Sequence, residues 1–416
     1  MPKRITLSQL GAVAVGNALE FYDFTTFAFF AIQIGQSFFP GRNASDKLLL
    51  SLATFGVGFV TRPLGGIVIG NLGDRWGRKP AMLLCFGLMG GAILGLALTP
   101  SYSAIGAAAP VLVVFFRLIQ GFALGGEVGP ATAFLLEAAP PEQRGFYVSL
   151  QFATQNCSIL AAGLVGLLLS NFLSVDQLND WGWRIALLLG TAVVPLGLFL
   201  RNRLPETFHL QERVKAPRVR LRRAHSRVAV LGVFMLACGT IATYTMNYLV
   251  TFATHTLGIP PRLAFGATVV TGLTGMLCNP LSGMLSDRYG RKPVMITAIT
   301  LLLCAALPCF FLMSILRTPT SLYIAGAVMA AMLGMGIPAM LIGLSESLPQ
   351  NIRSGGIGTI YAVSISVFGG TAQFVITWLI GATGSSLAPA YYLSAAAVLG
   401  LTAMTQMRET APHRLN

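Results

Sequence analysis

The stretch GNLGDRWGRKP at residues 70–80 returns in closely similar form as GMLSDRYGRKP at residues 283–293. A second pair lies at nearly the same separation, with EAAPPEQRG at residues 137–145 and ESLPQNIRS at residues 346–354. Chance is a poor explanation for two independent markers that recur at almost one spacing. They indicate that the chain consists of two duplicated halves with the same order of elements.

The composition does not suit a protein dissolved in water. Of 416 residues, 54% are hydrophobic and only 10% are charged, whereas a soluble domain takes about a quarter of its residues from Asp, Glu, Lys and Arg. A helix that crosses a bilayer needs roughly 20 apolar residues. Twelve such segments lie near residues 9–38, 48–72, 80–99, 108–137, 145–173, 183–203, 228–256, 262–285, 293–315, 319–347, 354–382 and 387–407. We therefore predict an all-α, polytopic membrane protein with twelve transmembrane helices.

The repeats divide these twelve segments into two sets of six. We predict an N-terminal six-helix bundle over residues 1–203, a basic cytoplasmic linker over residues 204–227, and a C-terminal six-helix bundle over residues 228–416. Because six is an even number, both halves enter the membrane from the same side.

Lys and Arg residues are distributed unevenly between the connecting loops. If the N-terminus is cytoplasmic, the opposite side of the membrane keeps only Arg42, Lys47, Arg184, Arg262 and Arg317. Basic loops resist translocation, so this asymmetry predicts that both termini are cytoplasmic. It also accounts for the net charge of +14 without a nucleic-acid partner. The basic linker can in addition contact anionic lipid headgroups.

Several motifs identify a resemblance to a known family. They are the doubled GxxxDRxGRK loop, GNALEFYDF at 16–24, RPLGG at 62–66, RLIQGFALGGE at 117–127 and WGWR at 181–184. The whole chain resembles the major facilitator superfamily, and within it the metabolite:proton symporters. The run QFATQN at residues 151–156 is similar to the citrate and tricarballylate carriers.

The resemblance implies a secondary transporter that imports a small organic anion, such as citrate, together with protons by alternating access. It also implies a monomer in the inner membrane of a bacterium, with no cofactor. The alternatives are a symporter for a 2-oxo acid, an aromatic acid or a zwitterionic osmolyte, and a proton-driven exporter. We do not expect an enzyme, because the sequence has no nucleophile and base constellation and no metal-ligand spacing. It also has no GxxxxGK[ST] loop, which disfavours direct drive by ATP.

Ionisable residues within apolar segments are costly to insert and usually functional. Five stand out here, namely Glu20, Asp23, Arg62, Arg117 and Glu127. We predict that Arg117 binds the substrate carboxylate, since a guanidinium offers two parallel donors; a permanent internal ion pair is the alternative. For proton coupling we predict Asp23 first, then Glu20 and Glu127, with Arg62 neutralising one of these acids.

Neutral polar side chains at helical spacing outline an expected cavity. The predicted substrate-binding set, besides Arg117, is Asn17, Tyr22, Gln151, Gln155, Tyr244, Asn247 and Tyr361. Each of these residues alone can instead hold neighbouring helices together through hydrogen bonds.

Charged residues in the repeated loops can pair across the boundary between the halves while the cytoplasmic side is closed. We predict that this conformational latch comprises Asp74, Arg75, Arg78, Glu137, Arg144, Asp287, Arg288, Arg291, Glu346 and Arg353. The latch role of the GxxxDRxGRK charges follows from the family resemblance. The alternative is that these charges only set topology and loop geometry.

Overall fold

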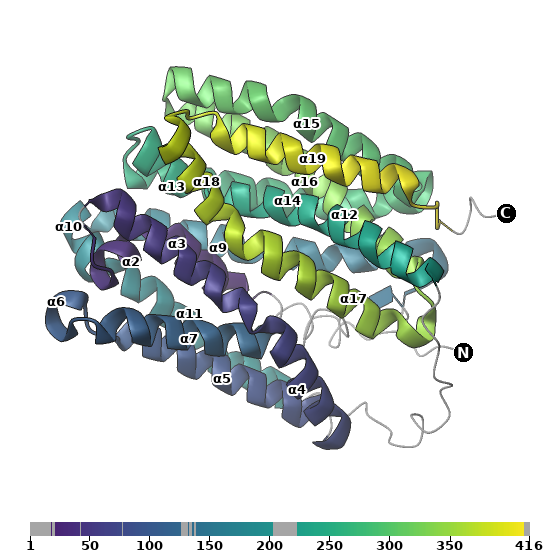
Figure 1. Ribbon diagram of the computed structural model, residues 1–416, viewed down its shortest axis with the longest axis horizontal. Coiled ribbons are helices and arrows are strands. Elements are labelled where there is room, and N and C mark those ends of the chain that lie inside the picture. The colour runs from purple at the N-terminus through teal and green to yellow at the C-terminus, as the bar shows by residue number, and fades with distance from the viewer. Residues whose placement is uncertain are drawn as a thin grey trace.

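The computed structural model describes residues 18, 21–41, 43–76, 78–125, 132, 135–136, 139–202 and 223–411. Within these ranges, the side chains at 70, 71, 73–76, 78–82, 192–194, 196–202, 223–225, 350–352 and 354 are not described. All regular elements in the described part are helices, which run roughly along one common direction (Figure 1). The predicted all-α fold is therefore confirmed.

The first half contains the helices that precede the basic linker. Residues 21–29 are helical and lead into α2 (Ala31–Phe38). They are followed by α3 (Ala44–Val60), α4 (Arg62–Trp76), α5 (Arg78–Leu98), α6 (Tyr102–Ile105), α7 (Ala108–Leu124), η1 (Pro141–Gln143), α9 (Arg144–Phe172), α10 (Val175–Gln177), η2 (Leu178–Gly182) and α11 (Trp183–Asn202).

The second half contains the helices that follow the basic linker. Its helices are α12 (Arg223–Asn247), α13 (Leu249–Thr251), η4 (Phe252–Thr256), α14 (Pro261–Tyr289), α15 (Arg291–Leu316), α16 (Pro319–Glu346), α17 (Gln350–Ser364), η5 (Ile365–Gly369), α18 (Gly370–Thr383) and α19 (Ala388–Gln406). Short breaks divide some spans. One occurs at Thr61, just before Pro63, which has no N–H to donate. At this break, the Thr61 hydroxyl donates a hydrogen bond to the Leu118 carbonyl of α7 at 2.7 Å.

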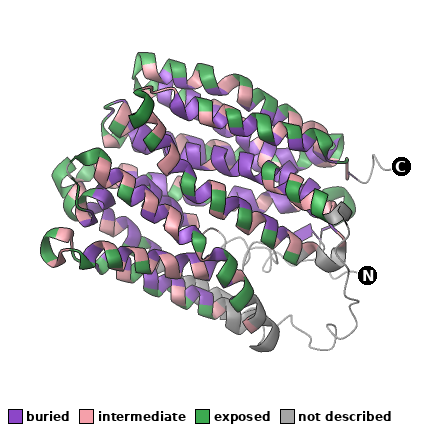
Figure 2. Cartoon of the chain, viewed as in Figure 1, coloured by how far each residue is buried: buried purple, intermediate pink, exposed green. Residues whose placement is uncertain are grey.

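The helices have the length and hydropathy that a bilayer requires. In the described part, 7 helical segments are long and apolar enough to cross a membrane, and Leu83–Leu98 and Ala108–Leu124 are shorter apolar helices. Large apolar side chains such as Val111, Leu277 and Ile315 are exposed, and exposed residues run along the outer helices of the bundle (Figure 2). An exterior of this kind is suited to lipid.

Two helix pairs bring the backbones of the two halves into close contact. Helix α9 lies against α14, where Gly272 leaves no room for a side chain beside Leu160 and Gly283 abuts the Gly145 carbonyl. Helices α3 and α18 approach at Gly56 and Gly370. Small residues at such crossings allow the backbones of membrane helices to pack closely. The two seams hold the halves together around a central space.

Glycines also set the packing inside the first half, which leads to a stability prediction. A Cβ at Gly121 on α7 would overlap the Gly58 carbonyl oxygen of α3, and the α3 backbone cannot turn aside. We expect Gly121→Ala to destabilise the protein by roughly 1–3 kcal/mol or to prevent folding. The measurement is the melting temperature in detergent. Gly91→Ala is the matched control because nothing lies within 4 Å of its Cβ position; an equal melting temperature for both variants would contradict the prediction.

Candidate functional site

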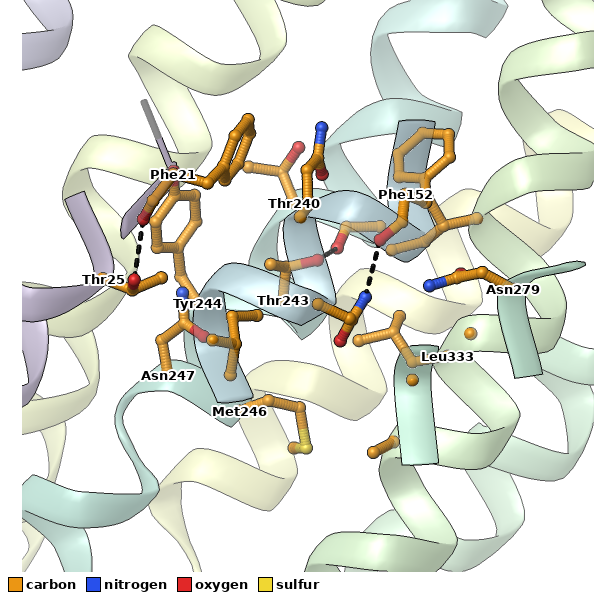
Figure 3. Close-up of a pocket in the computed structure, with 18 of the residues that line it drawn as sticks. Phe21, Thr25, Phe152, Thr240, Thr243, Tyr244, Met246, Asn247, Asn279 and Leu333 are labelled. Atoms are coloured by element: carbon orange, nitrogen blue, oxygen red, sulfur yellow. Dashed lines mark hydrogen bonds between the residues drawn. The ribbon is translucent and has the colours of Figure 1, made fainter. Parts of the chain in front are cut away.

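The central cavity has a volume of about 100 Å³ and lies between the two halves. Residues 21–25 and α9 of the first half line it together with α12, α14, α16 and α17 of the second half (Figure 3). The polar and aromatic side chains that line it are Phe21, Phe24, Thr25, Phe152, Gln155, Asn156, Thr240, Thr243, Tyr244, Asn247, Thr271, Asn279 and Tyr361.

No charged side chain lines this cavity in the described part of the chain. The wall instead offers amides, hydroxyls and aromatic rings, which can hydrogen-bond a ligand and stack on it. The Asn279 side-chain nitrogen is buried without a hydrogen-bond partner although Asn279 lines the cavity. Since an unpartnered buried donor is costly, Asn279 is well placed to bond a ligand oxygen.

A buried ion pair stands beside the cavity. Arg117 on α7 and Asp23 are both buried, and Arg117 Nη1 lies 3.8 Å from Asp23 Oδ2. The same Nη1 donates to Gln120 Oε1 at 2.6 Å. Neither carboxylate oxygen of Asp23 has a hydrogen-bond partner among the described residues. The pair is therefore held by Coulomb attraction in a region of low dielectric and not by direct hydrogen bonds.

Aromatic rings separate Arg117 from the cavity. Its guanidinium carbon lies 4.5 Å from the centre of the Phe24 ring and 4.1 Å from that of Phe27, and its exposed fraction is 0%. Phe24 itself lines the cavity, whereas Arg117 does not. In this conformation Arg117 makes the internal pair that the sequence left as the alternative, because Asp23 and the ring faces already surround its charge.

Aromatic rings lie against the guanidinium of Arg62. The sequence predicts that it neutralises an acid, but no carboxylate lies within ion-pair distance of it among the described residues. Its guanidinium carbon instead lies 4.2 Å from the centre of the Phe59 ring and 4.6 Å from that of Phe24. Asp23 is paired with Arg117, and Glu20 and Glu127 lie outside the described residues, so the acid-neutralising role of Arg62 stays a prediction.

The structure divides the predicted substrate-binding set. Gln155, Tyr244, Asn247 and Tyr361 line the cavity. Tyr22 and Gln151 do not: the Tyr22 hydroxyl donates to the Ala186 carbonyl at 3.1 Å, and Gln151 Oε1 accepts from Thr132 at 3.0 Å. Both hydrogen bonds join segments of the first half.

Several predicted residues lie outside the described part. They are Asn17, Glu20, Glu127 and Glu137, together with the side chains of Asp74, Arg75 and Arg78. Their roles remain predictions. The described residues also contain no group of three or more His, Cys, Asp or Glu that could hold a metal ion.

The sequence reasoning missed some cavity residues. Asn156 on α9 faces Gly275 on α14, where any side chain larger than hydrogen would overlap its amide. Phe24 and Thr243 also line the cavity. The available signal was modest: Asn156 directly follows Gln155, and Thr243 adds to the polar residues of the same helix.

A charged cluster, which we define as Asp287, Arg291, Glu346 and Glu409, closes one end of the α9–α14 seam. Asp287 accepts from the backbone N–H groups of Gly145 and Phe146 at 2.8 and 2.9 Å. These groups belong to the first turn of α9, where N–H groups have no partner within the helix. A residue at the end of α14 thus caps a helix in the other half.

Arg291 holds the cluster together. Its Nη1 donates to Asp287 Oδ1 at 2.6 Å, while Nε and Nη2 donate to the two Glu346 oxygens at 3.1 and 3.2 Å. Of the other predicted latch residues, Arg353 Nε donates to the Ser345 carbonyl and Arg288 lies over the Tyr289 ring. Arg144 begins α9 beside the residues that Asp287 caps.

Two family models together match most of the chain. The family described as "Sugar (and other) transporter" matches residues 11–220, and the family described as "Major Facilitator Superfamily" matches residues 233–414. The citrate-proton symporter of Klebsiella pneumoniae is 34% identical over 398 residues, which cover 94% of this chain and 89% of that protein. The chain belongs to the major facilitator superfamily.

Other relatives of this superfamily member differ in their named substrates. The proline/betaine transporter of Escherichia coli (strain K12) is 33% identical and covers 96% of this chain and 83% of that protein. The alpha-ketoglutarate permease of the same strain is 34% identical, and the match covers 86% of this chain and 84% of that protein. A solved D-xylose-proton symporter has a TM-score of 0.78 at 19% identity, over 97% of this chain and 98% of that one. This last likeness shows the fold, with two six-helix halves, and the relatives are transporters and not enzymes.

Glu409 is a member of the charged cluster that the sequence did not suggest. In this major facilitator protein it follows α19, and its carboxylate accepts from the N–H groups of Arg291 and Lys292 at 2.9 and 3.0 Å. It thereby caps the first turn of α15. The neighbouring Thr410 hydroxyl donates to Glu346 Oε2 at 2.8 Å, so the segment after α19 is tied to the cluster at two points.

The Glu409 contacts predict a pH-dependent contribution to stability. Partial burial alone would raise the pKa of the Glu409 carboxyl, but the N–H groups of Ala411, Arg291, Lys292 and Thr410 together hold that pKa below its ordinary value of 4.5. A lowered pKa in the folded state stabilises the fold above pH 4.5, and this stabilisation is lost as the pH falls through the folded-state pKa. We expect Glu409→Gln to melt at a lower temperature than wild type at about pH 6, with the difference shrinking toward about pH 3.5. A difference that is constant across this range would contradict the assignment.

Proposed function

We propose that this transporter is a proton-coupled symporter for small carboxylates, with a di- or tricarboxylate such as citrate as the first candidate. The observation that carries the proposal is the Asp23–Arg117 pair, buried directly behind the Phe24 wall of a neutral cavity between the halves. The named relatives add support, because citrate, α-ketoglutarate, proline and betaine all carry a carboxylate.

We assign the proton to Asp23. When Asp23 is ionised, its charge attracts Arg117 across 3.8 Å; when it is protonated, that attraction disappears and the two helices are free to move apart. A carboxyl group near an arginine and near apolar walls can therefore couple protonation to helix position. Glu20 and Glu127 stay as further candidates for the same role.

The substrate would bind in the central cavity. Gln155, Asn247, Tyr244 and Tyr361 offer neutral hydrogen-bonding groups there, and Asn279 offers an unpartnered donor. We do not carry Tyr22 and Gln151 forward as substrate contacts, since their polar atoms already bond other helices. Arg117 is assigned to Asp23 in this conformation, and Asn17 remains a candidate from the first helix.

Alternating access would proceed by rocking one half against the other. We propose that the charged cluster is the latch that closes the cytoplasmic side, with Asp74, Arg75, Arg78 and Glu137 as its counterparts in the first half. The same proposal places both termini in the cytoplasm of a bacterium and treats the transporter as a monomer in the inner membrane.

A zwitterion such as proline or betaine is the second candidate substrate. The aromatic rings of Phe21, Phe24, Phe152, Tyr244 and Tyr361 line the cavity, and ring faces attract quaternary ammonium groups. A carrier for such a compound would need the same carboxylate recognition as a citrate carrier.

The test is counterflow in proteoliposomes with labelled citrate, α-ketoglutarate, proline and betaine. Binding of the same compounds is measured separately as a rise in melting temperature at two pH values, because a ligand of the native state stabilises it. We expect exchange of at least one carboxylate and its accumulation under an inward proton gradient. Expulsion under that gradient would identify an exporter, and exchange of none of the acids would refute the proposal.

A further inference from the structure

We infer that Arg62 is the residue that receives the substrate carboxylate, and that the Phe24 ring is the movable wall in front of it. The inference rests on the proposed function and deepens it, since it names the group that recognises the anion. It starts from a mismatch in the cavity. A carboxylate requires a positive partner in a low-dielectric site, yet no lining residue in the described chain is charged.

Two guanidinium groups lie behind the same ring. The centre of the Phe24 ring is 4.6 Å from the Arg62 guanidinium carbon and 4.5 Å from that of Arg117. Phe24 is also part of the cavity wall. A rotation of this single side chain would therefore change the access from the cavity to either cation.

Arg117 is already engaged. It donates to Gln120 and lies opposite Asp23, its guanidinium also faces Phe27 and Phe55, and its exposed fraction is 0%. A substrate carboxylate would have to compete with Asp23 for it. Arg117 is thus suited to the proton-linked pair and poorly suited to be the first contact of an incoming anion.

Arg62 is not engaged in this way. Within the described chain it has no ion pair and no hydrogen bond, its Nε is buried without a partner, and its exposed fraction is 8%. The rings of Phe24 and Phe59 lie against its guanidinium. A buried guanidinium without an acid is unfavourable by itself, and a bidentate carboxylate would relieve that cost.

The position of Arg62 also connects the halves. The Phe59 ring, whose centre is 4.2 Å from the Arg62 guanidinium carbon, packs against the Tyr244 ring of α12 at 5.5 Å between ring centres. Tyr244 and Tyr361, on α17, both line the cavity and belong to the second half, whereas Arg62 begins α4 in the first. A carboxylate held between Arg62 and the hydroxyls of these tyrosines would therefore draw the halves together, as an occluded state requires.

The experiment measures ligand-induced thermal shifts of the full-length protein in detergent. The probes are citrate, α-ketoglutarate and proline, each beside the ester or amide that removes its carboxylate charge. The variants are Arg62→Gln, Arg62→Lys and, as a control that removes one positive charge, Arg262→Gln, which alters an exposed residue at the start of α14. For Arg62→Gln we expect the affinity for the bound acid to fall about 10- to 100-fold and the preference for acid over ester or amide to disappear.

The control should retain wild-type affinity, and Arg62→Lys should lose about three- to tenfold, since it keeps the charge without the planar fork. Unchanged affinity and preference in Arg62→Gln would overturn the inference and leave the proposed function intact. If Arg62→Gln does not fold, an Arg62→Lys affinity within about twofold of wild type would overturn it instead. If the wild type binds none of the acids, the proposed function fails and the inference fails with it.

Discussion

Asp23→Asn should abolish accumulation driven by a proton gradient while leaving exchange of substrate across the membrane intact. Asparagine resembles aspartic acid in shape but cannot release a proton, so the variant would stay in the protonated-like state. The attraction across 3.8 Å to Arg117 would also be lost. We expect the accumulation ratio in proteoliposomes to fall to about 1, the value for a carrier that only equilibrates its substrate.

The control for this experiment is Asp176→Asn, which makes the same chemical change at an exposed residue on α10. It should accumulate substrate as wild type does. Normal accumulation by Asp23→Asn would move the proton role to another acid, with Glu20 and Glu127 as the next candidates. Loss of both accumulation and exchange in a folded protein would assign Asp23 to substrate binding or to the conformational change itself.

Asp287→Ala should open the charged end of the α9–α14 seam and slow transport by at least about tenfold. The carboxylate accepts three hydrogen bonds, two from the first turn of α9 and one from Arg291. Hydrogen bonds to charged groups contribute about 1.5–3 kcal/mol each, so their loss shifts a two-state equilibrium strongly toward the open form.

The opening can be measured as the labelling rate of a cysteine introduced by Ser149→Cys, in a background without the native cysteines. Ser149 is buried, and its hydroxyl lies against Gly283 at the seam. Labelling should become faster in Asp287→Ala. Glu142→Ala, which removes an exposed acid near the same end, is the control and should change neither labelling nor transport. Wild-type rates in Asp287→Ala would reduce the cluster to a purely structural role.

The number and order of the helices could be read from the chain because each apolar segment meets its requirement locally. A helix satisfies its own backbone hydrogen bonds, and lipid accepts its apolar side chains, so no distant partner has to be known. The predicted division into halves follows from the repeats, which can be recognised in the sequence without knowledge of distant contacts. Helix ends were less certain: the second segment begins at Ala44 and is interrupted at Thr61, whereas the prediction was one helix over residues 48–72.

The site was predicted only in part. The sequence identified Asp23 and Arg117 as costly residues in an apolar setting, and the structure brings these two together. It could not tell whether Arg117 reaches the cavity, since that depends on Phe24. Phe24 is indistinguishable in sequence from the other phenylalanines nearby.

Sequence alone therefore determined the all-α membrane architecture, its duplicated halves and the scarcity of charge within the helices. Tertiary structure alone decided which partner each buried charge takes: Asp23 for Arg117, aromatic rings for Arg62, and the start of α9 for Asp287. The physical reason is the distance along the chain over which each effect acts. Hydrophobic length and periodicity act over about 20 neighbouring residues, whereas a buried charge is satisfied by whichever group the packing of distant helices places within a few ångströms.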